Sequence, residues 1–395
     1  MHRRGDTIGF LTQTQEWGGA EVHTAAVARA LEAHGRRSVI LQLGHDIYSA
    51  PERAVASPGV DVVPVPLPIQ LRESRPAFWR DLIRAHSLDT VVLVKGSFSV
   101  RWSSLDLAML LRSRRYLRIE HATLPPHRVW KPGRHLGGRV PGLGLWYVRY
   151  TAALWLHRAA SERVIAVSRS IGQSLVDDYH YGRSRVTVIL NGVDSSRFVA
   201  DPAAAARARA RWNIPAGAFV VGTVARLAPQ KRLDRLLEAF KRLAADAPNA
   251  YLVLVGVGPE EQALRALADR LGLSGRCRWA GVSSVPSQEY SGFDCFAMTS
   301  EVEGLPYALL EAMACERMVV AMEAPGVSEV LTDAGTARLV AANVGAFASA
   351  LAEVMAAAPE YRAEVGARAR RYVQEHHEAR RQIEAVCAVI RAPEA

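Results

Sequence analysis

The sequence is poor in cysteine and has no long uncharged hydrophobic run. No stretch approaches the ~18 apolar residues that a membrane-spanning helix needs, and residues 1–19 lack the apolar core and small-residue cleavage site of a signal peptide. These absences predict a protein that is made and kept in the cytoplasm. None of the four cysteines has the spacing of a metal site, so reduced packing residues are predicted: Cys277, Cys295, Cys315 and Cys387.

The pattern Asp-x-Asp, in which paired carboxylates hold a divalent cation, is also absent from the chain. A carboxylate-bound metal is therefore not predicted, and no cofactor is expected. We expect any bound anion to be neutralised by cationic side chains and by the free N–H groups at helix starts.

Basic residues outnumber acidic ones, and the formal net charge is +10. Residues 72–139 hold most of the excess, with 14 Lys and Arg against 5 Asp and Glu. One interpretation is an acidic partner, such as a membrane surface or a phosphorylated acceptor. The other is an Arg-rich surface without a function. Nucleic acid is not predicted as a partner, because no binding module for it is recognisable.

Short apolar runs alternate with helical patterns along the chain, which predicts an α/β protein with parallel sheets. The length of 395 residues exceeds what one hydrophobic core usually serves, so two domains are expected. One long C-terminal helix is predicted from about residue 360 through Ile390. The expected strands include Thr7–Thr12, Ser38–Leu43, Val60–Val65, Thr90–Val94, Arg115–Ile119, Val164–Val167, Val186–Leu190, Phe219–Val224, Tyr251–Val255, Cys295–Thr299 and Val319–Met322.

The most informative stretch, residues 293–322, predicts a strand, a helix and a second strand. Pro306 suits the first turn of that helix, where its missing N–H costs no hydrogen bond. Glu303 precedes the helix, and Glu311 lies inside it on a stripe of small side chains. Such units bind ligands at the carboxyl ends of their strands, and the helix start favours an anion. Glu311 alone would be interpreted as a solvated surface residue, whereas the two carboxylates with Gly304 and Pro306 between them indicate a site.

Two other strand ends are candidates for binding a phosphate. Arg226 and Lys231 bracket the turn after the strand expected at 219–224, where two cations and a helix start can meet a diphosphate. Gly18 and Gly19 lie between the first strand and the next helix, where paired glycines let the backbone approach a ligand. A Gly-Gly pair more often marks only a turn, so Gly18 and Gly19 alone are weak evidence for a phosphate site.

The strand expected at 115–119 ends in Glu120-His121, which puts His121 at an edge of the sheet where ligands bind. A single histidine at such a place is more often a packing or surface residue than a ligand-binding one. Both interpretations stay open on the residues alone.

The segment 124–144 contains too many Pro and Gly residues for a regular element, and it carries four Lys or Arg and two His. Long irregular segments in compact domains are usually functional or mobile loops. Aromatic residues follow it closely, and either they approach a membrane interface or, as their helical spacing favours, they belong to the core: Trp146, Tyr147, Tyr150 and Trp155.

The stretch Glu303-Gly-Leu-Pro-Tyr-Ala-Leu-Leu-Glu311 resembles the retaining GT-B glycosyltransferases of family 4, and so does the spacing Arg226-x4-Lys231. The resemblance covers nearly the whole chain. It implies two Rossmann-like domains that face each other across a cleft. Residues 1–195 would form the acceptor domain and 196–372 the donor domain, with the last helix, about 373–395, packing back on the first domain.

The resemblance implies roles for the residues around the central helix. Glu303 would contact the donor sugar, and Glu311 would bind the ribose hydroxyls of the nucleotide. The backbone amides of Gly304 and Leu305 would help to hold the donor, and the backbone near Val282 would contact the base.

It also implies roles for the remaining candidates. Arg226 and Lys231 would bind the donor phosphates, which Gly19, next to Gly18, would face from the other domain. His121 would lie near the donor sugar, although Ala122 stands where the family usually has Asp.

The reaction implied is transfer of a sugar from a nucleotide-sugar to a glycan, lipid-linked or small-molecule acceptor. UDP is preferred over GDP by analogy, and the configuration at the anomeric carbon would be retained without a metal. A nucleotide-sugar epimerase shares such a fold, but it needs further acid and base groups, and no additional clustered carboxylates are found. A non-catalytic nucleotide-sugar binding protein is the third hypothesis, against which the intact candidate residues argue.

Overall fold

The computed structural model describes residues 7–12, 18–43, 55, 57–65, 75–95, 103–111, 115–122, 143–283 and 285–393. The predicted basic loop lies outside these residues up to position 142, as do the side chains of Trp146, Tyr147 and Tyr150. No helix in the described part of the chain is both long and apolar enough to cross a membrane.

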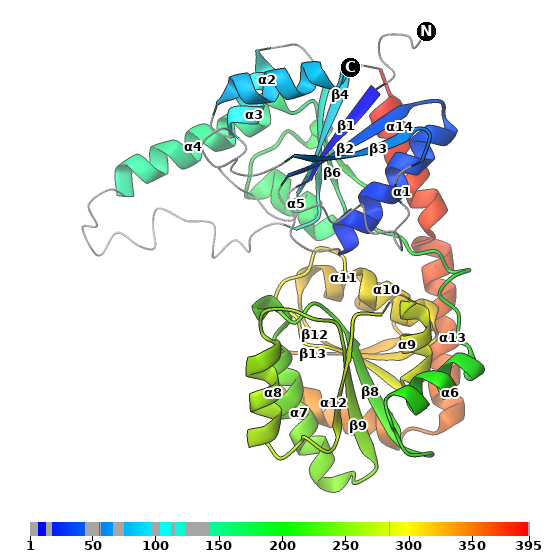
Figure 1. The fold of residues 1–395 in the computed structure, drawn as a ribbon. Coiled ribbons are helices and arrows are strands. Elements are labelled where there is room, and N and C mark those ends of the chain that lie inside the picture. The colour runs from blue at the N-terminus through cyan, green and yellow to red at the C-terminus, as the bar shows by residue number, and fades with distance from the viewer. Residues whose placement is uncertain are drawn as a thin grey trace. The chain divides into compact units, whose positions relative to one another are not determined.

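Strands and helices alternate along the chain and form two parallel sheets in two compact units (Figure 1). Residues 1–190 and 382–395 form the first unit, and residues 191–381 form the second. The predicted fold class, an α/β protein with two Rossmann-like domains, is therefore confirmed. The apolar runs mark the strands reliably because strands of a parallel sheet are buried on both faces.

The first unit has a seven-stranded parallel sheet in the order β3-β2-β1-β4-β5-β6-β7. Its strands are β1 (Thr7–Thr12), β2 (Arg37–Leu43), β3 (Val60–Val65), β4 (Thr90–Lys95), β5 (Arg115–Glu120), β6 (Arg163–Ala166) and β7 (Val186–Val188). Its helices are α1 (Gly19–Ala33), α2 (Pro76–Ala85), α3 (Ser103–Leu110), α4 (Leu143–Ala160), α5 (Arg169–Asp177) and most of α14 (Ala379–Arg391).

Alternate side chains of β1 enter two separate cores on the two faces of this sheet. Phe10 packs with residues of α1, α5 and α14, and Leu11 packs with residues of α2 and α3. The alternation follows from the two-residue period of a strand. Both faces are thus covered, as a parallel sheet requires.

The second unit has a six-stranded parallel sheet in the order β10-β9-β8-β11-β12-β13. The strands are β8 (Phe219–Val224), β9 (Ala250–Val255), β10 (Cys277–Gly281), β11 (Cys295–Met298), β12 (Met318–Met322) and β13 (Ala337–Val340). The helices are α6 (Pro202–Arg211), α7 (Leu233–Asp246), α8 (Glu261–Arg270), α9 (Pro286–Gly292), α10 (Tyr307–Ala314), α11 (Pro325–Ala334), α12 (Val344–Ala356) and α13 (Pro359–His376).

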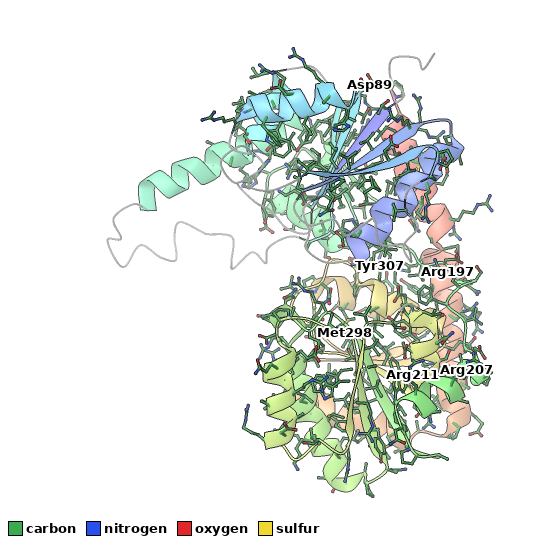
Figure 2. The ribbon with its side chains drawn as sticks, viewed as in Figure 1. Asp89, Arg197, Arg207, Arg211, Met298 and Tyr307 are labelled. Carbon is green, nitrogen blue, oxygen red and sulfur yellow. The ribbon has the colours of Figure 1, made fainter. Side chains whose placement is uncertain are left out.

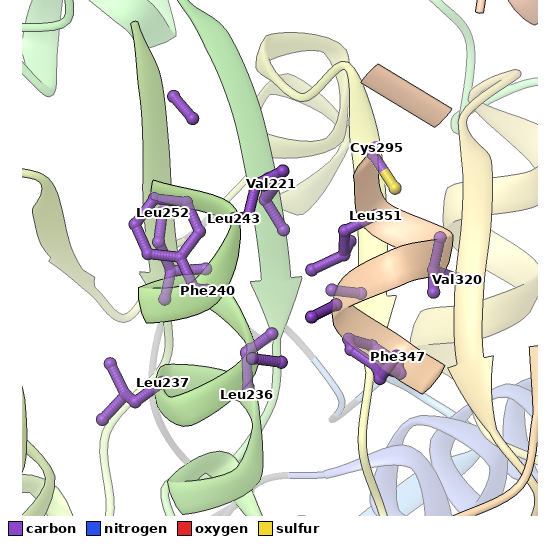
Figure 3. Packing of buried hydrophobic residues seen from close by; sticks show 14 of the residues in the cluster. Val221, Leu236, Leu237, Phe240, Leu243, Leu252, Cys295, Val320, Phe347 and Leu351 are labelled. Carbon is purple, nitrogen blue, oxygen red and sulfur yellow. The ribbon is translucent and has the colours of Figure 1, made fainter. Parts of the chain in front are cut away.

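The main core of the second unit lies where α7 and α12 pack against its sheet (Figure 3). Phe240 of α7 and Phe347 of α12 are fully buried there, against Val221 of β8 and Val320 of β12. All four cysteines of the chain are also buried and unpaired, which confirms their assignment as reduced packing residues.

Strand order in the second unit reverses between β8 and β11, which are neighbours in the sheet but far apart in sequence. The chain builds β9 and β10 on one side of β8 and then crosses to the other side of β8, where it forms β11. Open α/β sheets bind ligands at such a point, outside the carboxyl ends of the strands. The segments that follow β8 and β11 hold Lys231 and Glu303, respectively.

The prediction of one long C-terminal helix was wrong, because α13 ends at His376 and α14 begins at Ala379. Val193 forms a bridge to Glu378 there: its N–H donates to the carbonyl of His377 at 2.8 Å, and its carbonyl accepts from the N–H of Ala379 at 3.0 Å. These bonds use backbone groups that a continuous helix would need, so the break belongs to the fold.

Candidate functional site

The side chains of Lys231 and Glu303 form an ion pair beyond the ends of β8 and β11. The Nζ atom of Lys231 donates to Oε1 of Glu303 at 2.6 Å, and both side chains are largely buried. The two residues are 72 positions apart in sequence, and the adjacent strands bring them together. A cation and a carboxylate thus lie where a ligand is expected.

The turn that presents Lys231 is fixed by the strand end beside it. Lys231 closes a short 3-10 turn, and Arg232 after it has left-handed backbone angles, φ 49° and ψ 43°. The hydroxyl of the buried residue Thr299 donates to the carbonyls of Lys231 at 3.1 Å and Arg232 at 3.0 Å. The N–H of Glu301 donates to the carbonyl of Gln230 at 2.9 Å. The cation therefore stands on a rigid support despite its place in a loop.

Arg226 lies two residues after the end of β8 and has an exposed side chain. Its segment packs against the loop after β9, where a Cβ on Gly256 would lie 2.0 Å from the carbonyl oxygen of Ala225 and one on Gly258 would lie 2.3 Å from that of Leu227. Only glycine allows this backbone contact. The position of Arg226 is fixed while its guanidinium stays accessible.

The loop Glu303–Pro306 is held from two other segments. The buried amide of Asn191 donates to the carbonyl of Leu305 at 2.8 Å, and its oxygen accepts from the Tyr307 hydroxyl at 3.3 Å. A Cβ on Gly326 would lie 1.7 Å from the carbonyl oxygen of Gly304, so the start of α11 touches the loop backbone. Figure 2 labels Tyr307, the first residue of α10, and Met298, the last residue of β11.

Pro306 is the N-cap residue of α10 and has an extended conformation, so the helix begins one residue later than the prediction placed it. Gly304 and Leu305 are buried directly before this helix start. Since α10 has eight residues and its first N–H groups have no partner within the helix, a nearby anion would be stabilised there.

Glu311 is not a solvated surface residue. It is half-buried in the second turn of α10, and its Oε2 atom accepts from the Tyr290 hydroxyl at 2.7 Å. Burial raises the pKa of Glu311 to about 7, against the opposing effects of the Tyr290 hydrogen bond and the charge of Arg197. A carboxylate placed this way costs stability, which is typical of functional positions.

Val282 follows β10 and is the most exposed large apolar residue of the described chain, with 74 % of its surface accessible. Gly281 before it has left-handed backbone angles, with φ 69°. The turn leaves backbone groups and an apolar side chain open to a ligand.

In the first unit, α1 begins at Gly19, and Gly18 before it is exposed, extended and without a side-chain cap. Glu21 in the first turn is buried, and a Cβ on Gly18 would lie 3.2 Å from its Oε2 atom. The helix start therefore has a carboxylate of its own close to Gly18. The sequence interpretation left this acidic neighbour out.

His121 follows β5, as expected, and its ring meets the ring of His23 edge to face, with centroids 5.1 Å apart. Burial lowers the pKa of His23 to about 4 and that of His121 well below its usual value, so both rings are neutral at pH 7. Among the described residues, none is a hydrogen-bond partner of the buried atoms Nδ1 of His23 and Nε2 of His121. His23 was not predicted, although it lies one helical turn after Gly19 and so shares its face.

A second cluster that sequence reasoning missed lies inside the first unit, around Arg118. Its Nε atom donates to Oε1 of Glu120 at 3.1 Å, and its Nη1 atom lies 3.8 Å from the carboxylate of Asp106, which also meets His157. Burial by itself would raise the pKa of Asp106. The hydrogen bond from His157 and the charge of Arg118 outweigh that effect, so the pKa of Asp106 lies below its usual value. Burial lowers the pKa of nearby Lys95 to about 7. The only local signal was a pair of charges two residues apart in an apolar strand.

The candidate residues thus fall into two groups. Lys231, Glu303 and the loop 303–306 come together at the switch point of the second unit, with Glu311 in the helix that follows. His121 and the glycine pair lie in the first unit. Among the described residues, no three acidic, histidine or cysteine side chains are placed to hold a metal ion.

Two protein-family models match the chain and together cover most of it. The model described as Glycosyltransferase Family 4 matches residues 17–197, and the model described as Glycosyl transferases group 1 matches residues 205–372. The first match lies almost wholly in the first unit and the second lies within the other.

Named relatives resemble part of the chain. A GDP-mannose-dependent alpha-(1-6)-phosphatidylinositol monomannoside mannosyltransferase of Mycolicibacterium smegmatis is 33 % identical over 177 residues, which cover 42 % of this chain and 46 % of the relative. A lipopolysaccharide core biosynthesis glycosyltransferase, LpsE, of Rhizobium meliloti is 33 % identical over 175 residues, covering 44 % and 48 %. The chain therefore matches just under half the length of these relatives.

Among solved structures, that of the Anabaena protein HepE in complex with UDP has a TM-score of 0.77 to this chain. The two share 20 % sequence identity, and the match covers 97 % of this chain and 99 % of the other. At this identity the likeness concerns the fold.

Proposed function

The chain belongs to the family 4 glycosyltransferases of the GT-B fold, and from this premise we propose that it transfers a sugar from a nucleotide-sugar to a hydroxyl group of an acceptor, with retention of configuration. The paired side chains of Lys231 and Glu303 at the switch point support this proposal most strongly. In our proposal the cation binds a phosphate of the donor, and the carboxylate beside it binds the sugar.

Charge develops on the diphosphate as the bond to the sugar breaks, so stabilising that charge is the main task of the site. In our proposal Lys231 and Arg226 neutralise it, together with the N–H groups at the start of α10. Arg226 is exposed, which suits it to capturing the diphosphate from solution. Lys231 is rigidly held, which suits it to positioning the diphosphate precisely. The departing phosphate would help to deprotonate the acceptor hydroxyl.

The remaining contacts of the donor are proposed from the resemblance. Glu303 would accept hydrogen bonds from sugar hydroxyls, and the amides of Gly304 and Leu305 would face the donor. Glu311 would accept from the ribose, and the exposed turn at Val282 would meet the base.

On the first unit, His121 is the proposed contact for the donor sugar, and Gly18 and Gly19 for its phosphate. Neutral His121 has a buried nitrogen that no described residue partners, which suits hydrogen bonding to a hydroxyl group. The buried carboxylate of Glu21 lies beside Gly18 and would repel a phosphate there. Of the proposed contacts, we therefore expect this one to require the Glu21 side chain to move.

We propose UDP as the nucleotide and a lipid-linked glycan as the acceptor. UDP is the ligand named for the HepE structure, whereas GDP-mannose is named for the mycobacterial relative, so both nucleotides belong in the test. The two relatives act, by their names, on a phosphatidylinositol mannoside and in lipopolysaccharide core synthesis. A basic region such as residues 72–139 would favour an acceptor at an anionic membrane surface.

The test is to incubate the purified chain with labelled UDP-glucose or GDP-mannose, with and without lipid-linked acceptors, and to measure free nucleotide and labelled product. Acceptor-stimulated release of UDP supports the proposal, and release of GDP corrects the nucleotide. Epimerised donor would show an isomerase instead. Binding without turnover across both donors and all acceptors would show a binding protein.

A further inference from the structure

Tyr290 is the one side chain in the described structure with a direct hydrogen bond to Glu311. Its hydroxyl donates to Oε2 of Glu311 at 2.7 Å, across 21 positions of sequence. The ring is completely buried and meets the rings of Phe198, Phe293 and Phe296 with centroids 5.8–6.1 Å apart. Three neighbouring aromatic rings therefore hold the tyrosine ring and fix its hydroxyl in space, and the carboxylate takes its position from that hydroxyl.

Other titratable and charged groups near Glu311 interact with it more weakly. Arg197, labelled in Figure 2, is exposed, so water screens its charge. From α13, Arg370 donates to the carbonyls of Ser195, Phe198 and Ala314 and pairs with Glu316. The groups on α10 and β11 are neutral at pH 7, since burial raises their pKa values: Tyr307, Cys315 and Cys295.

The protonation state of Glu311 decides which hydrogen bonds it can form. An ionised carboxylate accepts at both oxygens, whereas a protonated one places a hydrogen where a ligand hydroxyl would donate. Burial alone favours the protonated form, and the Tyr290 hydroxyl opposes it, because a donated hydrogen bond stabilises the charged form. Tyr290 itself stays protonated, since burial and the nearby Glu311 charge raise its pKa.

We propose that Tyr290 is a positioning residue for the nucleotide: its hydroxyl orients the Glu311 carboxylate and keeps it in the form that accepts from the two ribose hydroxyls. One lone pair of Oε2 is used by Tyr290, which leaves Oε1 and the rest of Oε2 for the ligand. The inference rests on the proposed function, because it assumes that Glu311 meets a ribose.

The experiment is a calorimetric titration of the full chain with UDP and with GDP between pH 5.5 and 9. It compares the wild type with Tyr290→Phe, which keeps the ring and removes the hydroxyl, and with Tyr251→Phe on β9 as a matched control. We expect Tyr290→Phe to weaken binding about tenfold at pH 7, and the control to change nothing. As pH rises, the nucleotide affinity of Tyr290→Phe should recover. The midpoint of this pH dependence should lie about one pH unit above that of the wild type.

Glu311→Ala separates this effect from other sources of pH dependence and from misfolding, because it removes the group that accepts from the Tyr290 hydroxyl. In that background the nucleotide phosphates still titrate, but no carboxylate remains at position 311, so adding Tyr290→Phe should change neither affinity nor pH profile. A loss that persists in the double variant would show a purely structural tyrosine and overturn the inference. So would a Tyr290→Phe protein with wild-type affinity and midpoint. A wild type that binds neither nucleotide would overturn the proposed function as well.

Discussion

The Nζ atom of Lys231 lies 2.6 Å from Oε1 of Glu303, so the two residues proposed for phosphate and sugar neutralise each other's charge. Both are largely buried, and a buried charge left alone is costly. In our proposal the diphosphate of the donor would take the place of Glu303 beside Lys231, and the sugar hydroxyls would take the place of Lys231 beside Glu303. Neither charge can be removed without affecting the other.

We predict that Lys231→Ala lowers sugar-transfer turnover at least tenfold, because a charged hydrogen bond to the leaving diphosphate contributes about 1.5–3 kcal/mol. Turnover and thermal unfolding are measured together, with Lys241→Ala, an exposed lysine on α7, as the control. Since Glu303 loses its partner, we also expect the double variant with Glu303→Gln to unfold at a higher temperature than Lys231→Ala alone. Wild-type turnover in Lys231→Ala would remove the phosphate role.

We predict that Glu311→Gln is more stable than the wild type at pH 8 but not at pH 5. The folded-state pKa of about 7 lies above the unfolded value, so the stability associated with protonated Glu311 is fully present below about pH 4.5 and is lost as pH rises through 7. Glutamine does not ionise and keeps that stability, so Glu311→Gln should be more stable than the wild type by about 1–3 kcal/mol at pH 8. Urea unfolding at both pH values checks this.

The matched control for that measurement is Glu360→Gln, an exposed glutamate at the start of α13. Nucleotide affinity should fall in Glu311→Gln and stay unchanged in the control, while turnover falls at least tenfold in Glu311→Gln. If Glu311→Gln and the wild type differed in free energy of unfolding by the same amount at pH 5 and pH 8, the prediction that Glu311 is a buried carboxylate with a raised pKa would be contradicted.

The sheets and the switch-point residues were predictable because each depends on local sequence. Buried parallel strands appear as continuous apolar runs, and a ligand-binding group must follow a strand end, as Lys231 and Glu303 do. The edge strand β13 was missed, since its residues are half-buried and one of them is Arg338.

Long-range contacts could not be predicted in the same way. The hydrogen bonds from Tyr290 to Glu311 and from Asn191 to Leu305 join segments 21 and 114 residues apart. Periodicity says which face of an element is apolar, but not which polar group of another element will meet it. The break before α14 was missed for the same reason, because Val193 causes it from nearly two hundred residues away.

We predict that Gly326→Ala disrupts donor binding. Its Cβ would lie 1.7 Å from the carbonyl oxygen of Gly304, a backbone atom that cannot turn aside as a side chain would, so the loop 303–306 must move. A shift of about 1 Å in such a loop can lower activity about a hundredfold. Gly275→Ala is the control, because nothing lies within 4 Å of its added methyl group. Equal nucleotide affinity in both variants would contradict the prediction.

We predict that Asn191→Asp weakens donor binding and lowers stability by about 1–3 kcal/mol. The change replaces the amide that donates to the Leu305 carbonyl by an oxygen, which repels it within a buried site. Tyr307→Phe removes only the longer bond, 3.3 Å, to the same side chain and should have a smaller effect. Urea unfolding and calorimetric titration with UDP distinguish the two, and the reverse order of effects would count against this account of the loop.

Arg118→Met should destabilise the first unit by about 3–5 kcal/mol at pH 7, because it leaves the buried carboxylates of Glu120 and Asp106 without their shared cation. The loss of stability in Arg118→Met should be smaller at pH 5, where a carboxylate without a cation takes up a proton more easily. Arg37→Met is the matched control: its ion pair with Asp61 is exposed, and such pairs contribute about 0–1 kcal/mol. Unfolding in urea at both pH values measures this, and similar losses in the two variants would mean that the buried charges are not coupled as their distances indicate.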